Sequence, residues 1–172
     1  IESSSLLLDM HEDYNPRGRA DVSVEITRES GLSSKFKLRR LLLVAKGGTA
    51  SCRFFPYTLS DVLGSVEYDG TSVSIRDLCG KRGEGHVCIN GWIAETNRCA
   101  PIDLHIEATN LTIDDELCAG LPPQYDRLRR DWNPQVTVEL LLSLYRRPCV
   151  NYELARWESE CDVHLTDVML TH

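Results

Sequence analysis

The sequence predicts an all-β fold, mostly β with one or two short helices, arranged as a disulfide-bonded antiparallel β-sandwich. Three observations support this class. Apolar and polar residues alternate with period two in several segments, Gly-containing turn dipeptides separate such segments, and seven cysteines are dispersed along the chain. With 172 residues, 42% of them hydrophobic and 26% charged, the chain suits a single domain over residues 1–172.

Period-two alternation predicts the individual strands. Residues 20–27 place valine and isoleucine at every second position, and residues 103–108 repeat this over a shorter length. Residues 135–144 continue it with Val and Leu, where a helix would scatter the same residues around its circumference. Residues 161–165 alternate as well, and the opposite phase after Thr166-Asp167 predicts a β-bulge there.

Turn dipeptides predict the connections between strands. Asp69-Gly70 and Asn90-Gly91 each stand between two strand-like runs, and a type I′ hairpin turn needs positive φ at both central positions. Each pair is therefore expected to form an exposed two-residue turn. Gly47-Gly48 is expected to join strands at residues 36–45 and 50–55.

Helical content is expected to be small. Residues 58–63 and 113–121 could each form a short helix. Thr112 is placed to cap the second, and the acidic residues that follow would suit the positive end of its dipole.

The cysteines indicate an oxidising compartment. No Cys-x-x-Cys pair is present to suggest structural zinc, and the sequon beginning at Asn110 predicts N-glycosylation in a secreted or extracellular protein. Because the number of cysteines is odd, one is left unpaired, joined to another chain, or paired with a residue outside this segment, and an oligomer could form through it. Only Cys149–Cys161 can be paired from local spacing. The disulfide candidates are Cys52, Cys79, Cys88, Cys99, Cys118, Cys149 and Cys161.

The chain starts at Ile1, so we expect a processed product or a fragment, from which a signal peptide could have been removed. No run approaches the roughly 20 apolar residues of a membrane-spanning helix. Membrane contact is expected only through an anchor outside this segment. The net charge of −7 argues against nucleic acid and anionic lipid as partners.

No catalytic motif is present, and we predict neither cofactor nor metal. His11-Glu12 lacks the second histidine of a zinc-protease motif, because Asn15 occupies its position. The acidic clusters at residues 9–13 and 114–116 do not match a calcium-binding loop, and a solvated turn and a helix N-terminus explain them. The expected function is therefore binding. The alternatives are a secreted hydrolase whose site assembles only in three dimensions, and a structural or adhesive domain of a larger extracellular protein.

The predicted binding residues lie in one aperiodic segment bounded by prolines. Tyr, Trp and Arg are enriched at binding hot spots, and loops on rigid β scaffolds commonly carry function. The competing interpretation makes Trp132 a structural cap with an arginine laid over its ring. The candidates are Tyr125, Arg127, Arg129, Arg130 and Trp132.

Several short stretches resemble the secreted poxvirus chemokine-binding proteins. They are Gly47-Gly48, Ser65-Val66-Glu67-Tyr68-Asp69-Gly70 with Val73 and Arg76, Asp21-Val22, and Ile102-Asp103-Leu104. The resemblance implies a secreted β-sandwich decoy that captures a chemokine or cytokine. The long acidic loop associated with that family is missing, and no site residue is transferred from it.

The cysteine count predicts three intramolecular disulfides and one remaining cysteine. Intact mass measured before and after alkylation without reductant counts the free thiols. Five or more free thiols in protein made through the secretory route would contradict the oxidising compartment.

Overall fold

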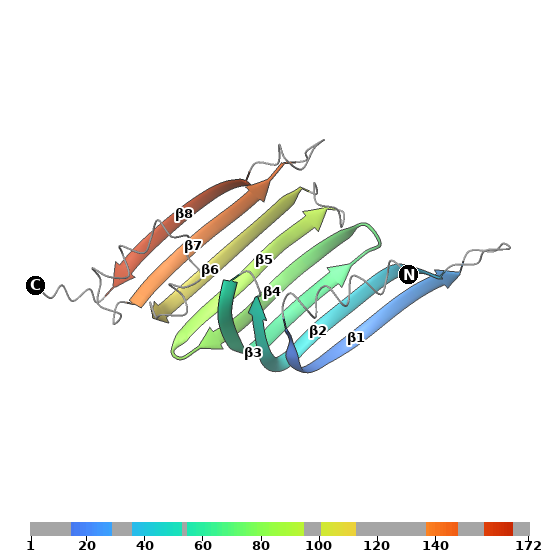
Figure 1. The fold of residues 1–172 in the computed structure, drawn as a ribbon, viewed down its shortest axis with the longest axis horizontal. Helices are drawn as coiled ribbons and strands as arrows, with labels where there is room; N and C mark the ends of the chain where they lie inside the picture. Colours follow the sequence, from blue (N-terminus) through green and yellow to red (C-terminus); the bar gives the residue numbers. More distant parts are fainter. Residues whose placement is uncertain are drawn as a thin grey trace, which may run out of the picture.

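A computed structural model describes residues 15–28, 36–52, 55–94, 101–112, 137–147 and 157–166. These residues form one antiparallel sheet of eight strands, and each strand pairs with the next along the chain. The strands lie side by side, with β1 at one edge and β8 at the other (Figure 1). The strands are β1 (Arg17–Arg28), β2 (Phe36–Cys52), β3 (Phe55–Tyr68), β4 (Ser72–Arg82), β5 (Gly85–Ala94), β6 (Ile102–Thr112), β7 (Thr137–Arg146) and β8 (Trp157–Thr166).

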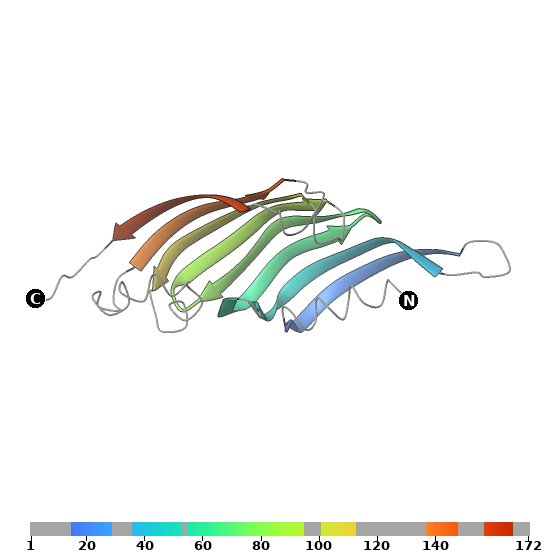
Figure 2. The same ribbon diagram turned by 45° about the horizontal axis from the view of Figure 1, so that its top comes forward.

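The predicted all-β class is confirmed, and the described residues contain no helix. The expected packing of two sheets is not what these strands form, since all eight belong to one curved sheet (Figure 2). Alternation in a sequence shows that one side of a strand is apolar, but it does not show what covers that side. Residues 58–63, expected as a helix, lie within β3 instead. The second expected helix, at residues 113–121, lies outside the described residues.

One side of the sheet is apolar, because directly paired residues point to the same side. Rows of paired apolar residues cross the strands, namely Val22–Leu43–Val66–Ile75 and Ile89–Ile106–Leu142. The best-buried cluster joins Tyr57 of β3 to Ala108 and Leu111 of β6. Leu59, Val87 and Leu140 pack against this cluster. The first half of β3 thus contributes to the core over β5, β6 and β7.

The β3–β4 hairpin is confirmed, but its turn lies one residue later than predicted. Asp69 and Ser72 are joined by a backbone hydrogen bond of 3.1 Å, so the two central residues are Gly70 and Thr71. Gly70 has a φ of 99°, which suits the Gly-first turn of type II′.

The Asp69 carboxylate holds this turn. It accepts hydrogen bonds from the backbone N–H groups of Thr71 and Ser72 and from both hydroxyls. The backbone bond from Ser72, followed by that from Thr71, lowers the pKa of Asp69 well below its ordinary 3.8. The stabilisation is therefore present above the ordinary pKa and is lost as the pH falls through the lower pKa of the folded state.

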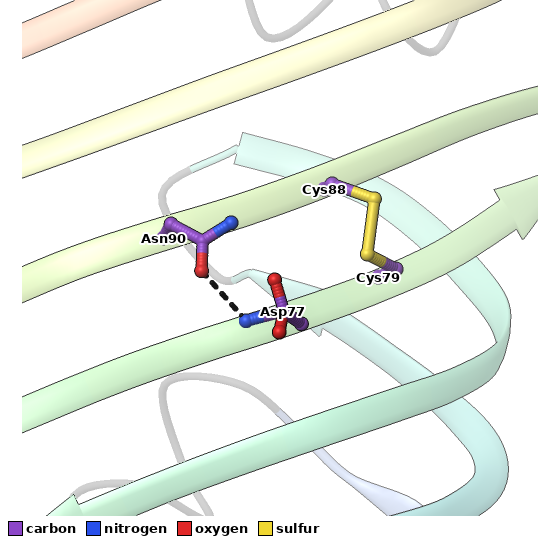
Figure 3. The surroundings of a disulfide bond; sticks show 4 residues. All are labelled: Asp77, Cys79, Cys88 and Asn90. Carbon is purple, nitrogen blue, oxygen red and sulfur yellow. Dashed lines mark hydrogen bonds between the residues drawn. A yellow bond between two sulfur atoms is a disulfide. The ribbon is translucent and has the colours of Figure 1, made fainter.

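The turn predicted at Asn90-Gly91 is wrong, because both residues lie within β5. The β4–β5 turn is formed by Gly83-Glu84 instead. Between the pairs Ile75–Gly91 and Leu78–Ile89, β4 has two residues where β5 has one, which is a β-bulge. The side-chain Oδ1 of Asn90 accepts a 2.7 Å hydrogen bond from the bulged Asp77 N–H (Figure 3).

The other glycine pair is also misplaced by the sequence prediction. Gly47-Gly48 lies inside β2, which runs without interruption from Phe36 to Cys52. The pairing of β2 with β3 skips both glycines, from Lys46–Leu63 to Thr49–Ser60.

Cys79 lies two residues after Asp77 of the bulge and directly opposite Cys88 of β5. The two cysteines form a disulfide, and their Cα atoms are 4.0 Å apart (Figure 3). This bond joins two strands that the Gly83-Glu84 turn already connects. Closing so short a loop contributes about 2–3 kcal/mol in the chain-entropy description.

Gly91 provides a test of the close approach between β5 and β6. It has a φ of 143°, and a Cβ added there would overlap the carbonyl oxygen of Asp103 on β6. Gly47 also has a positive φ, of 92°, but its Cβ would meet nothing within 4 Å. We expect Gly47→Ala to lower the free energy of unfolding by about 1 kcal/mol, from backbone strain alone. Gly91→Ala should lower it by about 3 kcal/mol, because a β-strand must also move away.

Urea denaturation followed by tryptophan fluorescence measures both values. Equal losses in the two variants would contradict the close approach of β5 and β6 at Gly91.

Candidate functional site

The predicted binding loop lies outside the described residues, so Tyr125, Arg127, Arg129, Arg130 and Trp132 remain a prediction.

Of the predicted disulfide residues, Cys79 and Cys88 are bonded to each other. Cys52 and Cys161 belong to β2 and β8. The predicted Cys149–Cys161 pair remains untested, because Cys149, like Cys99 and Cys118, lies outside the described residues.

The predicted glycosylation residue, Asn110, is exposed near the end of β6. It has a φ of 51° and lies at the register shift between Ala108 and Leu111. Thr112 of the sequon is also exposed, whereas Leu111 between them is buried. The amide that would carry a glycan therefore lies on an irregular, accessible part of the strand.

The side of the sheet opposite the apolar side is polar, and over β5 to β8 it is acidic. Because paired residues share a side, three rows cross these strands. The rows are Trp92–Asp103–Tyr145–Glu158, Asn90–His105–Ser143–Glu160 and Cys88–Glu107–Leu141–Asp162, with the pair Glu139–His164 beyond them. We call this surface the acidic face.

The acidic face has a large negative charge. Six carboxylates belong to it, namely Asp103, Glu107, Glu139, Glu158, Glu160 and Asp162. Arg147 is the cation beside them among the described residues, with its Nε 3.3 Å from Glu158. Six carboxylates against one guanidinium leave a formal charge of −5 with the histidines neutral.

Apolar side chains are exposed among these carboxylates. Trp92 is 42% exposed and Leu141 is 56% exposed, although both are large and apolar. Trp92 lies in the row of Asp103 and Tyr145, and Leu141 lies between Glu107 and Asp162. Exposed apolar groups bordered by charge are typical of surfaces that bind another molecule.

His105 lies between a carboxylate and a hydroxyl near the centre of the acidic face. Its Nε2 is 3.1 Å from Asp103 Oδ1, and its Nδ1 is 3.1 Å from Ser143 Oγ. The Tyr145 ring meets the imidazole edge-on, with ring centroids 5.9 Å apart. Asp103 Oδ1 is buried but has no well-directed hydrogen bond, so its contact with the ring is electrostatic.

These three groups have the chemical types of a serine hydrolase triad. Their connectivity differs, because in the usual triad the serine meets Nε2 and the carboxylate meets Nδ1. His105 is also exposed over 56% of its side chain, so water reaches the imidazole. The arrangement orients the ring and is compatible with polar recognition of a ligand.

The polar side over β1 to β4 differs from the acidic face, because three of its carboxylates are paired with cations. Arg40 donates to Glu67 at 2.8 Å and lies 3.7 Å from Glu25. Arg76 lies 3.8 Å from Glu67, and Lys46 is paired with Asp21. Exposed pairs of this kind contribute little to stability, but they neutralise one another.

Sequence reasoning missed the acidic face. The signal was present at residues 158–162, where acidic residues alternate with Ser159 and Cys161. Register then places these residues in the same cross-strand rows as Asp103 and Glu107, which come more than 50 positions earlier in the chain, with β7 between them.

No group of three His, Cys, Asp or Glu side chains that could hold a metal ion occurs in the described part of the chain. Among the same residues there is no helix with the length and apolar character needed to cross a bilayer. Comparisons with protein families, curated proteins and solved structures find no significant match to this chain.

Proposed function

We propose that this chain is an extracellular protein-binding module that captures a basic secreted protein, most concretely a chemokine or cytokine, and so acts as a decoy. The observation that carries the proposal is the acidic face. It combines six carboxylates with the exposed side chains of Trp92 and Leu141 on one rigid sheet. The resemblance to poxvirus chemokine-binding proteins is consistent with the same class of partner.

The size of the surface suits a protein partner. Eight strands spaced about 4.8 Å apart, each about ten residues long, give one side of the sheet an area of roughly 1,100 Å². A specific complex buries about 800 Å² on each partner. The whole polar side is therefore large enough for a complete interface, and the acidic face forms about half of it.

The charge suits a cationic partner. Clustered carboxylates attract a basic protein over distances of about a Debye length and raise the rate of association. Trp92 and Leu141 can then supply apolar contact that slows dissociation. In this proposal the acidic face is the main binding surface, and the arginine-rich segment at residues 125–132 is a further contact region.

Secretion belongs to the same proposal. The Cys79–Cys88 disulfide is a bond that persists in oxidising compartments, and Asn110 is accessible for glycosylation. A protein that intercepts soluble extracellular signals would need both the compartment and the stability that the disulfide adds.

Neutralising the acidic face should weaken capture. In the triple variant Glu158→Gln, Glu160→Gln, Asp162→Asn, association with a basic chemokine should be at least about tenfold slower at low salt. The salt dependence of the association rate should also fall. Surface plasmon resonance against a panel of purified chemokines and cytokines, both basic and acidic, measures both quantities.

A matched control removes three exposed charges elsewhere, through Asp61→Asn, Asp77→Asn and Glu84→Gln. Both variants have the same net charge, so only the position of the carboxylates differs. Equal effects in the two variants, or equal binding of basic and acidic panel members, would contradict recognition by the acidic face.

Hydrolysis is the second candidate function, because Asp103, His105 and Ser143 lie in series. A fluorophosphonate probe labels serines that a neighbouring base activates. We expect equal, background labelling of the natural protein and of His105→Ala, since the reversed connectivity does not present Ser143 to Nε2. Labelling of Ser143 that disappears in His105→Ala would instead favour a hydrolase.

A further inference from the structure

Strand β1 forms one edge of the sheet that the described residues build. It pairs only with β2, and all twelve of its residues are exposed. Its outer N–H and C=O groups therefore face no other described strand. Natural edge strands are commonly protected by proline, lysine or a bulge that turns the edge away. β1 contains neither proline nor lysine, and the two register shifts in its pairing with β2 place the extra residue on β2 and not on β1.

The other edge has such protection. On β8, Glu158, Glu160 and Asp162 occupy alternate exposed positions. A second β8 beside it would bring carboxylates together, and like charges opposite each other destabilise a strand pair. The two edges of the sheet thus differ in their suitability for pairing with another copy.

The exposed side chains of β1 favour strand pairing. Val22, Val24 and Ile26 are 57%, 48% and 59% exposed and lie on the apolar side of the sheet. Phe36, at the neighbouring end of β2, is 64% exposed. β-branched residues on one face of an exposed strand gain contact when a further strand is added.

We propose that β1 is the interface through which two copies of this chain associate, edge to edge and antiparallel, about a twofold axis at Val22. In that register Ala20 lies opposite Val24 of the second copy. Arg19 lies opposite Glu25 of the second copy, and the symmetry makes this ion pair twice.

Charge complementarity favours this register over the two neighbouring ones. With the axis one residue further on, at Ser23, Asp21 would lie opposite Glu25 of the second copy. With the axis at Asp21, that carboxylate would lie opposite itself. Of these three axes, only the one at Val22 places Arg19 opposite Glu25 and brings no two like charges together.

The twofold axis is perpendicular to the sheet, so it continues the sheet and keeps both polar sides on the same side of the dimer. Such an interface is closed, because each copy uses its single β1 edge. Two acidic faces would then be presented in one direction, one from each copy. The association itself does not depend on what the acidic face binds.

A charge-swap experiment tests the proposal. We expect sedimentation velocity of the natural chain to show a concentration-dependent monomer–dimer equilibrium. Arg19→Glu and Glu25→Arg should each raise its dissociation constant at least about tenfold. The double variant should regain the dimer. An equimolar mixture of the two single variants should also associate, because a heterodimer of one copy of each places glutamate opposite arginine at both pairs. Lys37→Glu, on β2, is the control and should dimerise normally.

Hydrogen exchange gives a second measurement that needs no substitution. Amides of β1 should gain protection as the protein concentration rises, while those of β8 should not. The proposal is overturned if the natural chain is a monomer at every concentration, if the charge swap fails to restore association, or if a dimer forms without protection of β1.

Discussion

Backbone pairing between consecutive strands is the interaction on which the other features of the sheet depend. Because side chains alternate, a slip of one residue between two strands would exchange the apolar and polar sides of everything that follows. The bulge at Arg76-Asp77 is critical for this reason. It sets the register from β4 to β5, and Asn90 compensates the bulged backbone through its hydrogen bond to the Asp77 N–H. The register of β5 in turn fixes which side chains of β6, β7 and β8 lie on each side of the sheet, because these strands pair one after another.

The distribution of charge follows from that register. Over β1 to β4 the pairing places arginine beside glutamate, so carboxylates on this part of the polar side are neutralised in ion pairs. Over β5 to β8 it places carboxylates from three strands together, with aromatic and apolar side chains among them. The polar side of one sheet thus has a half whose carboxylates are paired with cations and a half that is strongly negative. Neither half needs a loop to create it.

Alternation was sufficient to predict β1, β6, β7 and β8, because each has one apolar side. It could not predict a single sheet, since the partner of an apolar side is not encoded in the strand itself. Glycines were misleading for a related reason. Asn90-Gly91 and Gly47-Gly48 resemble turns, but positive φ also serves bulges and close strand approaches inside a strand. The acidic face was missed because its carboxylates come from residues 103–162 and are joined only by register.

The order of the strands also affects how the protein acquires its structure. Every strand pair joins neighbours in the sequence, so the loops closed during folding are short compared with those of a Greek-key sandwich. Folding rates of β proteins fall as contacts become more distant along the chain, and a meander therefore belongs to the faster part of that range. The Cys79–Cys88 bond lies inside one hairpin, where it can form before any other strand has docked. Growth of the sheet outward from this covalently closed β4–β5 ribbon would leave β1 and β8 as the last strands to join.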